Sequence, residues 1–487
     1  MTQGTVPDCR VEVLNSTGVR ASGAYVLVWM VAARRTRWSW LLQHARDVSL
    51  QLKKPVLVLE GLSRTYPWAC SRFHQFVIEG MEDNARAFER AGIQYYPYVE
   101  PRDGAGQGLL EALSESAAVV ITDYKPGFFQ SRMQERVAQR LSCRVERVDD
   151  NGLLPLSQSL RPWPTAHSLR RHLQRVLPDL LTALPDPDPL AALKGSPLAE
   201  VPVLVTAKWP RFDIAHGPSD SVIDTLSGPG VVEGVRGGSA EASTLWEQFL
   251  GDKLGRYHQS RNAVEPEGTS LLSSYLHFGH LSSVQMVSDV LTSHGWTHAH
   301  LSPDVRGSRQ GWWGLSEPAE GFLDQVITWR EIGHVFCHQV PDFANYESLP
   351  EWALKTLEEH ANDPRPVTYT LEQLDTAATH DRVWNAAQNQ LRQTGRIHNY
   401  LRMLWGKKIL EWSPHPKDAM AVMIELNNRY ALDGRDPNSY SGIAWCLGRF
   451  DRAWGPERPI FGKIRYMSSD NTQRKLRVKP YLERWDP

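Results

Sequence analysis

The alternation of apolar runs and helical segments between residues 24 and 148 constrains the fold more than any other feature. Residues 24–32 (AYVLVWMVA) are almost continuously apolar, as expected of a strand that is buried on both faces. Further strands are expected at residues 55–59, 93–99, 118–124 and 143–148, separated by helical patterns at 38–53, 69–91, 109–116 and 130–141. This alternation predicts an α/β domain with a doubly wound, Rossmann-like parallel sheet, and such sheets bind ligands beyond the carboxyl ends of their strands.

From residue 241 onward, almost every periodic segment has the spacing of an α-helix, and convincing strand alternation is absent. Helical patterns are expected over residues 243–257, 282–294, 318–337, 349–360, 371–379, 381–394, 398–411 and 416–430. The C-terminal part is therefore predicted to be an all-α domain with functional loops between its helices.

Chain length and proline distribution suggest the domain boundaries. A chain of 487 residues is too long for a single hydrophobic core. After residue 150, prolines and then glycines and serines interrupt the regular pattern, as is typical of a connector. We expect a flexible N terminus over 1–23, an α/β domain over 24–150, a connector over 151–240 and a helical domain over 241–487.

The composition is typical of a soluble protein in a reducing compartment. The five cysteines are widely spaced and include no C-x-x-C pair, which argues against a disulfide framework. The N-terminal residues carry no signal-peptide pattern, and no apolar run approaches the ~18 residues that a membrane span needs. We expect a monomer without a membrane partner, located in the cytoplasm, or in the nucleus of a eukaryote.

Positive charge and tryptophan gather toward the C-terminal end of the chain. Residues 396–479 contain 16 Lys and Arg against 8 Asp and Glu, although the whole chain has a formal net charge of −1. Residues 379–467 hold five of the 18 tryptophans. A near-neutral chain with this distribution is expected to bind an anionic, flat partner there, and a flavin together with a damaged DNA strand is our hypothesis.

Two short motifs have both a structural and a functional interpretation. One consists of Thr269, Ser270, Leu271, Leu272 and Ser273. Its three hydroxyls precede a helix-like segment, so they could seat a phosphate or simply cap the helix. The other, GAGQG at 104–108, does not directly follow a strand, and we interpret it as a flexible loop rather than a phosphate loop.

No metal site is predicted. His334 and His338 lie one helical turn apart with Cys337 between them, a spacing that zinc ligands use. A third ligand at a suitable spacing is not evident, so packing or hydrogen bonding explains the pair better.

Trp405 and Trp412 are seven residues apart on one predicted helix, which places them on the same face and ~10 Å apart along the axis. This spacing suits core packing and also permits electron hopping, with Trp384 on the preceding helix as a third member. Arg402 and Asp433 could form a buried ion pair. Asp433 belongs to a sharp turn, LDGRDPN, whose charged residues would suit the polar ring edge of a cofactor.

Several long motifs of the C-terminal half resemble the class II cyclobutane pyrimidine dimer photolyases of the photolyase/cryptochrome family. They are SLLSSYLHFGHLS (270–282), ITWRE (327–331), THDRVWNAAQ (379–388), HNYLRMLWGKKILEW (398–412), LNNRYALDGRDPNSYSGIAWC (426–446) and ERPIFGKIRYM (457–467). The similarity extends in order over residues 240–470. The N-terminal alternation agrees with the family's antenna domain in outline, and the proline-rich residues 151–200 diverge most.

The resemblance implies light-dependent repair of pyrimidine dimers in UV-damaged DNA by electron transfer from excited FADH−, so the enzyme class expected from it is that of the deoxyribodipyrimidine photo-lyases. It implies an FAD in the helical domain and allows a second, antenna chromophore of the 8-hydroxydeazaflavin type. The implied FAD-binding residues are Tyr257, Thr269, Ser270, Leu271, Leu272, Ser273, Arg330, Arg402, Asp433, Arg435 and Asn438. Trp405, Trp384 and Trp412 would form the photoreduction chain.

The resemblance also implies how a flipped dimer is held. Trp329 and Trp445 would flank the dimer, with Met403 beneath it. Asn427, or with less support Asn438, would approach flavin atom N5. Since a dimer inside a duplex cannot reach a buried flavin, it must be flipped out of single- or double-stranded DNA, and its weakened stacking lowers that cost.

One position departs from the family pattern. Where the family has a glutamate that protonates the dimer, this chain has Gln325, next to Asp324. Glutamine can donate a hydrogen bond but cannot supply an acidic proton. Asp324 is a poor substitute, because neighbouring residues of a helix point about 100° apart. Slower repair is therefore expected.

Two other functions remain open. A cryptochrome-like blue-light photoreceptor is favoured by Gln325 but not by the chain end at Pro487, which leaves no long signalling tail. A light-independent flavin oxidoreductase would need a nicotinamide fingerprint, and we find none.

Overall fold

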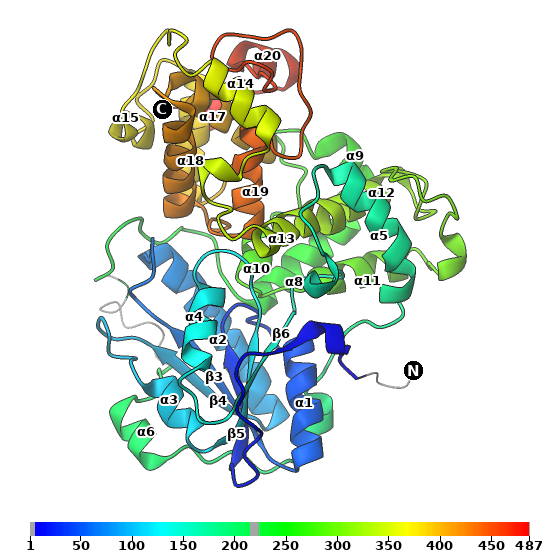
Figure 1. Cartoon of the computed structure of the whole chain (residues 1–487), viewed down its shortest axis with the longest axis vertical. Helices are drawn as coiled ribbons and strands as arrows, with labels where there is room; N and C mark the ends of the chain where they lie inside the picture. The colour runs from blue at the N-terminus through cyan, green and yellow to red at the C-terminus, as the bar shows by residue number, and fades with distance from the viewer. Residues whose placement is uncertain (1–4, 215–222, 224, 487) are drawn as a thin grey trace. The chain divides into compact units, whose positions relative to one another are not determined.

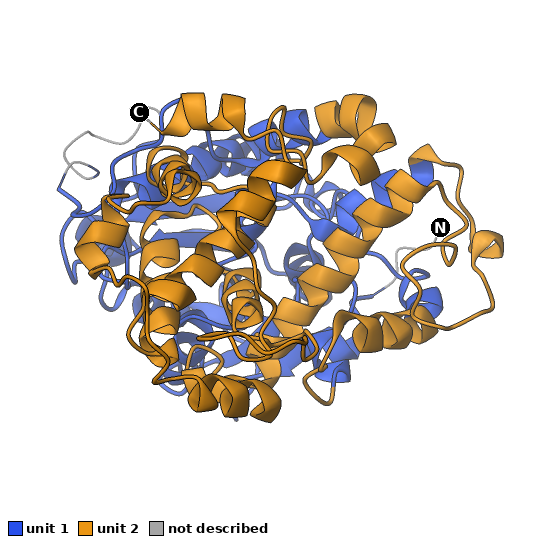
Figure 2. Cartoon of the chain, turned by 90° about the horizontal axis from the view of Figure 1, so that it is seen from above, with its two compact units in different colours: residues 1–159, 177–246, 272–292 blue, residues 160–176, 247–271, 293–487 orange. Residues whose placement is uncertain are grey.

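The computed structural model describes residues 5–214, 223 and 225–486. Contacts divide the chain into two compact units, coloured separately in Figure 2. Unit 1 comprises residues 1–159, 177–246 and 272–292, and unit 2 comprises residues 160–176, 247–271 and 293–487. Within the described residues, no helix combines the length and the hydropathy needed to cross a bilayer.

Unit 1 is built on one six-stranded sheet (Figure 1). Its strands are β1 (Val11–Val13), β2 (Tyr25–Met30), β3 (Val56–Leu62), β4 (Gln94–Val99), β5 (Ala117–Asp123) and β6 (Arg144–Val148). The spatial order is β1-β6-β5-β2-β3-β4, and every neighbouring pair is parallel except β1 with β6. The predicted parallel α/β fold is confirmed.

The N-terminal residues differ from the flexible start predicted for 1–23. Residues 1–4 lie outside the described part of the chain, but β1 pairs with β6 in the register Val11↔Val148. Three residues of an edge strand are too short to produce a visible alternation, which is why the pattern did not reveal β1.

Helices cover both faces of the sheet. Those of unit 1 are α1 (Trp40–Leu52), α2 (Ser71–Ala91), α3 (Leu109–Ser114), α4 (Gln130–Ala138), α6 (Val203–Lys208), α8 (Ser239–Gln248), α10 (Ser273–His277) and α11 (Ser283–Ser293). Val26 and Val28 of β2 pack in one core cluster with residues of α1 and α2, whereas Tyr25 and Leu27 pack in another with residues of α3 and α4. Both faces of β2 are therefore buried, in agreement with its continuous apolar run.

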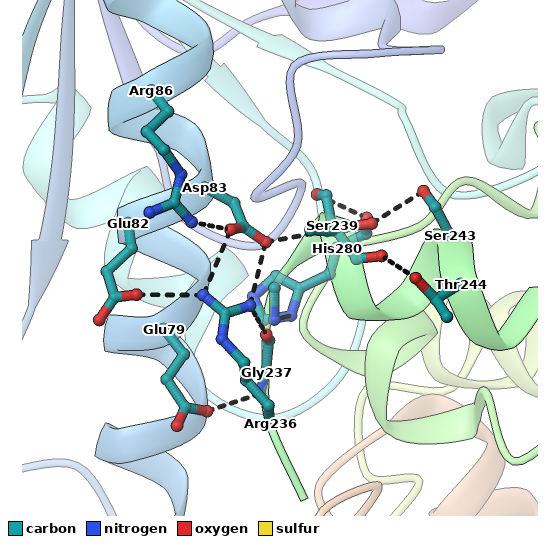
Figure 3. Close-up of polar contacts among 12 residues, drawn as sticks. Glu79, Glu82, Asp83, Arg86, Arg236, Gly237, Ser239, Ser243, Thr244 and His280 are labelled. Carbon is teal, nitrogen blue, oxygen red and sulfur yellow. Dashed lines mark hydrogen bonds and ion pairs between the residues drawn. The ribbon is translucent and has the colours of Figure 1, made fainter.

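A polar clasp ties residues 236–240 to helix α2 (Figure 3). The Asp83 carboxylate accepts a hydrogen bond from the Ala240 N–H at 2.8 Å and pairs with the Arg236 guanidinium at 3.3 Å. Burial opposes ionisation of Asp83, but these hydrogen bonds and the positive charge of Arg236 lower its pKa overall. Gly238 has φ 99°, and a Cβ atom there would lie 2.3 Å from Asp83 Oδ2, so only glycine fits this close approach.

The same clasp includes His280, which lies between α10 and α11. Its Nδ1 accepts a hydrogen bond from the Gly238 N–H at 2.9 Å, and its ring stacks on Phe76 of α2 with centroids 5.3 Å apart. These contacts explain why residues 177–246 and 272–292 group with the α/β unit, although the sequence analysis assigned them to a connector and to the helical domain.

Unit 2 is helical, and its described residues contain no strand longer than an isolated bridge. Its helices are α5 (Ala166–Leu180, which continues into unit 1), α9 (Tyr257–Ser260), α12 (Glu317–Leu323), α13 (Arg330–Gln339), α14 (Glu351–Glu359), α15 (Leu371–Asp375), α16 (Arg382–Thr394), α17 (Asn399–Trp412), α18 (Pro416–Tyr430), α19 (Pro437–Cys446), α20 (Ser469–Lys475) and α21 (Lys479–Trp485). The predicted all-α character is confirmed.

Two π-helical segments interrupt the expected helices, at Phe249–Lys253 (η4) and Asp324–Trp329 (η7). The continuous helix predicted over 318–337 is therefore wrong in its middle, where η7 separates α12 from α13. Such π-bulges are rare and often occur at functional sites.

Candidate functional site

Three buried tryptophans of α16 and α17 form a contiguous chain of rings. Trp384, Trp405 and Trp412 are 0%, 2% and 1% exposed. Trp384 lies between the other two, stacked on Trp405 with centroids 6.4 Å apart at an angle of 2°, and edge-on to Trp412 at 5.5 Å. The proximity predicted for the three rings is confirmed.

Hydrogen bonds fix the orientation of two of these indoles. Trp384 Nε1 donates to the Trp405 carbonyl at 3.1 Å, and Trp405 Nε1 donates to Gln388 Oε1 at 2.9 Å. Gln388 lies one helical turn after Trp384 and is fully buried. The sequence analysis missed its part in the site, although the spacing of four residues places both side chains on one face of α16.

Arg402 and Asp433 form the predicted ion pair. Arg402 Nη2 is 2.9 Å from Asp433 Oδ1, and both side chains are largely buried. The turn that carries Asp433 is held by Ser439, whose hydroxyl donates to the Asp433 carbonyl, and by Asn428, whose Oδ1 accepts from the Arg435 N–H. Arg435 has φ 63°, a left-handed conformation that costs free energy and is typical of constrained functional turns.

One atom of this pair lacks a partner. Within the described part of the chain, Arg402 Nε is buried and has no hydrogen-bond acceptor. An unsatisfied buried donor costs about 1–3 kcal/mol. Arg402 Nε is therefore available to an acceptor, such as one supplied by a bound group.

Two asparagines lie close to the turn. Asn427 is 2% exposed and donates from Nδ2 to Asn428 Oδ1 at 3.3 Å. Asn438 lies in the first turn of α19, where its Nδ2 donates to Asp436 Oδ1 at 3.2 Å. A Cβ atom on Gly333 would lie 2.6 Å from Asn438 Oδ1, so α13 and α19 pack tightly at this point.

Trp329 and Trp445 contact each other directly. Their ring centroids are 5.1 Å apart at an interplanar angle of 30°, and both side chains are half-buried. Met403, on α17 next to Arg402, is also half-buried. The two indoles stack on each other and form a single aromatic wall, and the expectation that they flank a ligand stays a prediction.

Gln325 and Asp324 lie in the π-helical segment that ends at Trp329. Gln325 is half-buried, whereas Asp324 is buried and forms a bidentate ion pair with Arg170 of α5, at 2.7 and 3.0 Å. Arg170 also donates to the Gly307 carbonyl. The carboxylate of Asp324 is thus engaged with Arg170, which agrees with the expectation that it is a poor substitute for the glutamate missing at position 325.

The hydroxyl-rich segment predicted to hold phosphates spans the boundary between the two units. Residues 269–271 belong to unit 2, and residues 272 and 273 belong to unit 1, where Ser273 opens the five-residue helix α10. The Thr269 hydroxyl donates to Glu267 Oε1 at 2.6 Å, so it is already engaged. Leu271 has φ 63°, which marks the segment as a tight turn.

Two further predicted cofactor residues have distinct environments. Tyr257 packs edge-on against Phe249 and Phe322, and burial raises the pKa of its phenol to about 12, so the hydroxyl remains a hydrogen-bond donor at neutral pH. Arg330 is half-buried and opens α13 directly after Trp329.

The fold and this site define a protein with an α/β unit and a helical unit whose buried tryptophans are suited to single-electron transfer. No family model matches the chain. Over 484 residues it is 34% identical to the deoxyribodipyrimidine photo-lyase of Methanothermobacter thermautotrophicus, covering 98% of this chain and 97% of that protein. The corresponding enzymes of Arabidopsis thaliana and Potorous tridactylus are each 30% identical, over 94% of this chain and 88% and 81% of their own lengths.

A solved structure has a similar fold. It is a bacterial class III photolyase from Agrobacterium tumefaciens, with a TM-score of 0.64 over 97% of this chain and 88% of that one, at 16% identity. The chain belongs to the deoxyribodipyrimidine photo-lyases of the photolyase/cryptochrome family. The predicted enzyme class is therefore confirmed.

Proposed function

We propose that this chain is a class II photolyase that repairs cyclobutane pyrimidine dimers in UV-damaged DNA by light-driven electron transfer from FADH−. The observation that carries the proposal is the arrangement along α17, where Arg402, Met403 and Trp405 fall within one helical turn. This turn connects three features: the tryptophan chain, the Arg402–Asp433 pair, and Met403, which is expected to lie beneath the pyrimidine dimer.

The residues present fit an FAD. Its isoalloxazine ring edge offers nitrogen and oxygen acceptors, which the buried and unsatisfied Arg402 Nε requires. Arg402, Asp433, Asn427 and the turn at 432–438 would hold this ring edge, with Asn438 as the alternative to Asn427. The remaining groups would come from Tyr257, Arg330, Arg435 and residues 269–273. When bound, FAD supplies a light-excitable single-electron carrier.

The side chains of the protein transfer the electrons and hold the flipped pyrimidines. Trp405, Trp384 and Trp412 pass electrons inward one ring at a time. The outer faces of the Trp329–Trp445 wall, with Met403, stack on the flipped pyrimidines and exclude water from them. The Gln325 amide donates a hydrogen bond to a pyrimidine carbonyl and leaves proton supply to another group.

The Lys and Arg residues of the C-terminal stretch bind the DNA backbone in a salt-dependent manner. We propose a monomeric, cytoplasmic enzyme, or a nuclear one in a eukaryote. An antenna chromophore of the 8-hydroxydeazaflavin type would lie in unit 1, at the carboxyl ends of its parallel strands. An absorption band of the purified protein in addition to those of FAD would report this second chromophore.

One observation favours a second function. Gln325 removes the acidic proton that the family's glutamate supplies, so a blue-light photoreceptor with FAD and little repair activity is the alternative. The two functions differ in what light does to a DNA lesion.

The test is illumination of the purified, reduced protein with dimer-containing single- and double-stranded DNA, followed by measurement of lesion loss. Light-dependent loss that Trp445→Ala abolishes and Trp454→Phe retains is the expected result, because Trp454 lies outside the aromatic wall and contacts Asp451. Bound FAD with intact photoreduction but without repair would favour the photoreceptor.

A further inference from the structure

The indole N–H groups of Trp405 and Trp384 are hydrogen-bonded to oxygens that are not basic. Trp405 Nε1 donates to the side-chain oxygen of Gln388 at 2.9 Å, and Trp384 Nε1 donates to the backbone carbonyl of Trp405 at 3.1 Å. The three residues are at most 2% exposed, so bulk water does not reach these N–H groups. A proton that left either indole would therefore have to go to an amide oxygen, which is a very weak base.

Both ends of the Gln388 amide are fixed by neighbours that allow only one orientation. Its Nε2 donates to the backbone carbonyl of Asp375 at 3.3 Å, and its Oε1 accepts from Trp405. A carbonyl oxygen can only accept and an indole N–H can only donate, so a flipped amide would lose both hydrogen bonds. The carboxylate of Asp375 is engaged with Arg429 of α18, at 3.0 Å. The group that meets the Trp405 N–H is therefore an amide and not a base.

The absence of a base beside Trp405 matters because oxidation makes an indole acidic. A tryptophan cation radical readily loses its Nε1 hydrogen to a base, and the neutral radical that remains holds the oxidation on that ring. If the hydrogen stays, the cation radical can take an electron from a neighbouring ring without any movement of a proton. Trp384 can supply that electron, since its ring is stacked on Trp405 with centroids 6.4 Å apart and lies 5.5 Å from Trp412.

We propose that Gln388 is a positioning residue of the electron relay, which keeps the indole hydrogen on Trp405 after that ring is oxidised. Once Trp405 has given one electron to the light-excited flavin, Trp384 supplies one electron to the Trp405 cation radical. Trp405 becomes neutral again, and the positive hole moves to Trp384 and then, in the same way, to Trp412. No proton moves in either transfer. The inference rests on the proposed function, because it requires the tryptophan chain to carry electrons to FAD.

Transient absorption spectroscopy of the FAD-loaded protein tests this role, because cationic and neutral tryptophan radicals have different absorption bands. In the wild type, we expect only the cation radical during transfer from Trp384 to Trp405, at a rate that is unchanged in D2O. Gln388→Glu retains an acceptor oxygen and adds a base once the new carboxyl is ionised, which its infrared band reports. At such a pH, a neutral radical should appear and the yield of photoreduction should fall several-fold. At lower pH, with the carboxyl protonated, wild-type behaviour should return.

Two other substitutions separate the effect of a base from the effect of the hydrogen bond. Gln388→Met removes the acceptor without adding a base, so the hole should still reach Trp412 and photoreduction should stay close to that of the wild type. Gln388→His adds an imidazole that burial keeps neutral and basic, so it should trap the hole even where the carboxyl of Gln388→Glu stays protonated. A purely structural role of Gln388 predicts that Gln388→Met is impaired more than Gln388→Glu at every pH, and this order would overturn the proposal.

Controls distinguish a failure of this inference from a failure of the proposed function. Gln390→Glu adds the same carboxyl to α16 on the side that contacts Tyr481, and it should behave as the wild type. Wild-type photoreduction in Trp384→Phe would overturn the relay and the role of Gln388 together. Loss of photoreduction in Trp384→Phe, with no neutral radical in Gln388→His or in ionised Gln388→Glu, would overturn the role of Gln388 alone. A reduced wild type that shows the expected radicals but repairs no dimers would overturn only the proposed repair.

Discussion

His280 should make the stability of the α/β unit strongly dependent on pH. Its imidazole is 2% exposed, and burial lowers its pKa from 6.5 to about 3. The geometry gives the same direction, because Nδ1 already accepts the Gly238 N–H and could not keep that bond if it carried a proton. A Cβ atom on Gly80 would lie 2.3 Å from Nε2, which shows how closely α2 approaches the ring.

The direction in which pH changes the free energy of unfolding depends on whether the folded or the unfolded protein binds the proton of His280. Between pH 3 and 6.5, unfolded His280 binds a proton that the folded form does not, so the free energy of unfolding rises with pH. Between pH 7 and pH 5, this single group should remove about 2 kcal/mol of stability. The loss should begin as pH falls through 6.5 and be complete only near pH 3.

Urea unfolding at several pH values measures this effect, with His280→Gln as the test variant and the exposed His298→Gln as the control. The His280 variant loses stability at every pH, but its pH dependence should be shallower than that of the wild type by about 2 kcal/mol over the same interval. Equal slopes in the two proteins, or a His280 carbon-13 resonance that titrates near its ordinary pKa, would refute the reasoning.

Three further outcomes are expected. Gln325→Glu should raise the quantum yield of dimer splitting, because it restores an acidic proton donor; an unchanged yield would show that Gln325 does not limit repair. Arg170→Ala should destabilise unit 2 by about 3–5 kcal/mol in denaturant unfolding, since it leaves Asp324 buried and unpaired; the double variant with Asp324→Leu should recover much of the loss. Trp384→Phe should retain repair when the protein is chemically reduced beforehand and lose only photoreduction, so a parallel loss of both would contradict its role as a relay.

The sheet could be predicted from the sequence because its signals are local. The apolar run at 24–32 and the helical patterns between strands depend on neighbouring residues, and the structure has β2 and α1 where these patterns lie. The grouping of residues 177–246 and 272–292 with unit 1 could not be predicted in this way. It depends on partners about 150 residues apart in the chain, such as Asp83 with Arg236 and Ala240.

The π-helical segment η7 is a second feature that local pattern does not show. The apolar residues of 318–337 suit one continuous helix, and no residue in FLDQVITW prevents it. The additional residue per turn is accommodated where Arg170, from a distant helix, holds the Asp324 carboxylate. Because the two partners of this ion pair are 154 residues apart in the chain, the local pattern of residues 318–337 does not contain the contact.

The arrangement of the tryptophan chain could be predicted only in part from the spacing of its residues. Seven residues on a helix separate Trp405 from Trp412 by ~10 Å along the axis, which leaves room for a third ring between them. Trp384 of α16 occupies that place and contacts both rings. The spacing could not reveal that Trp412 is buried, because the exposure of its side chain depends on residues 361–381, which pack against it. That segment brings Tyr369 and His380 against Trp412. Residues outside α17, the helix that carries Trp405 and Trp412, therefore cover the outer end of the tryptophan chain.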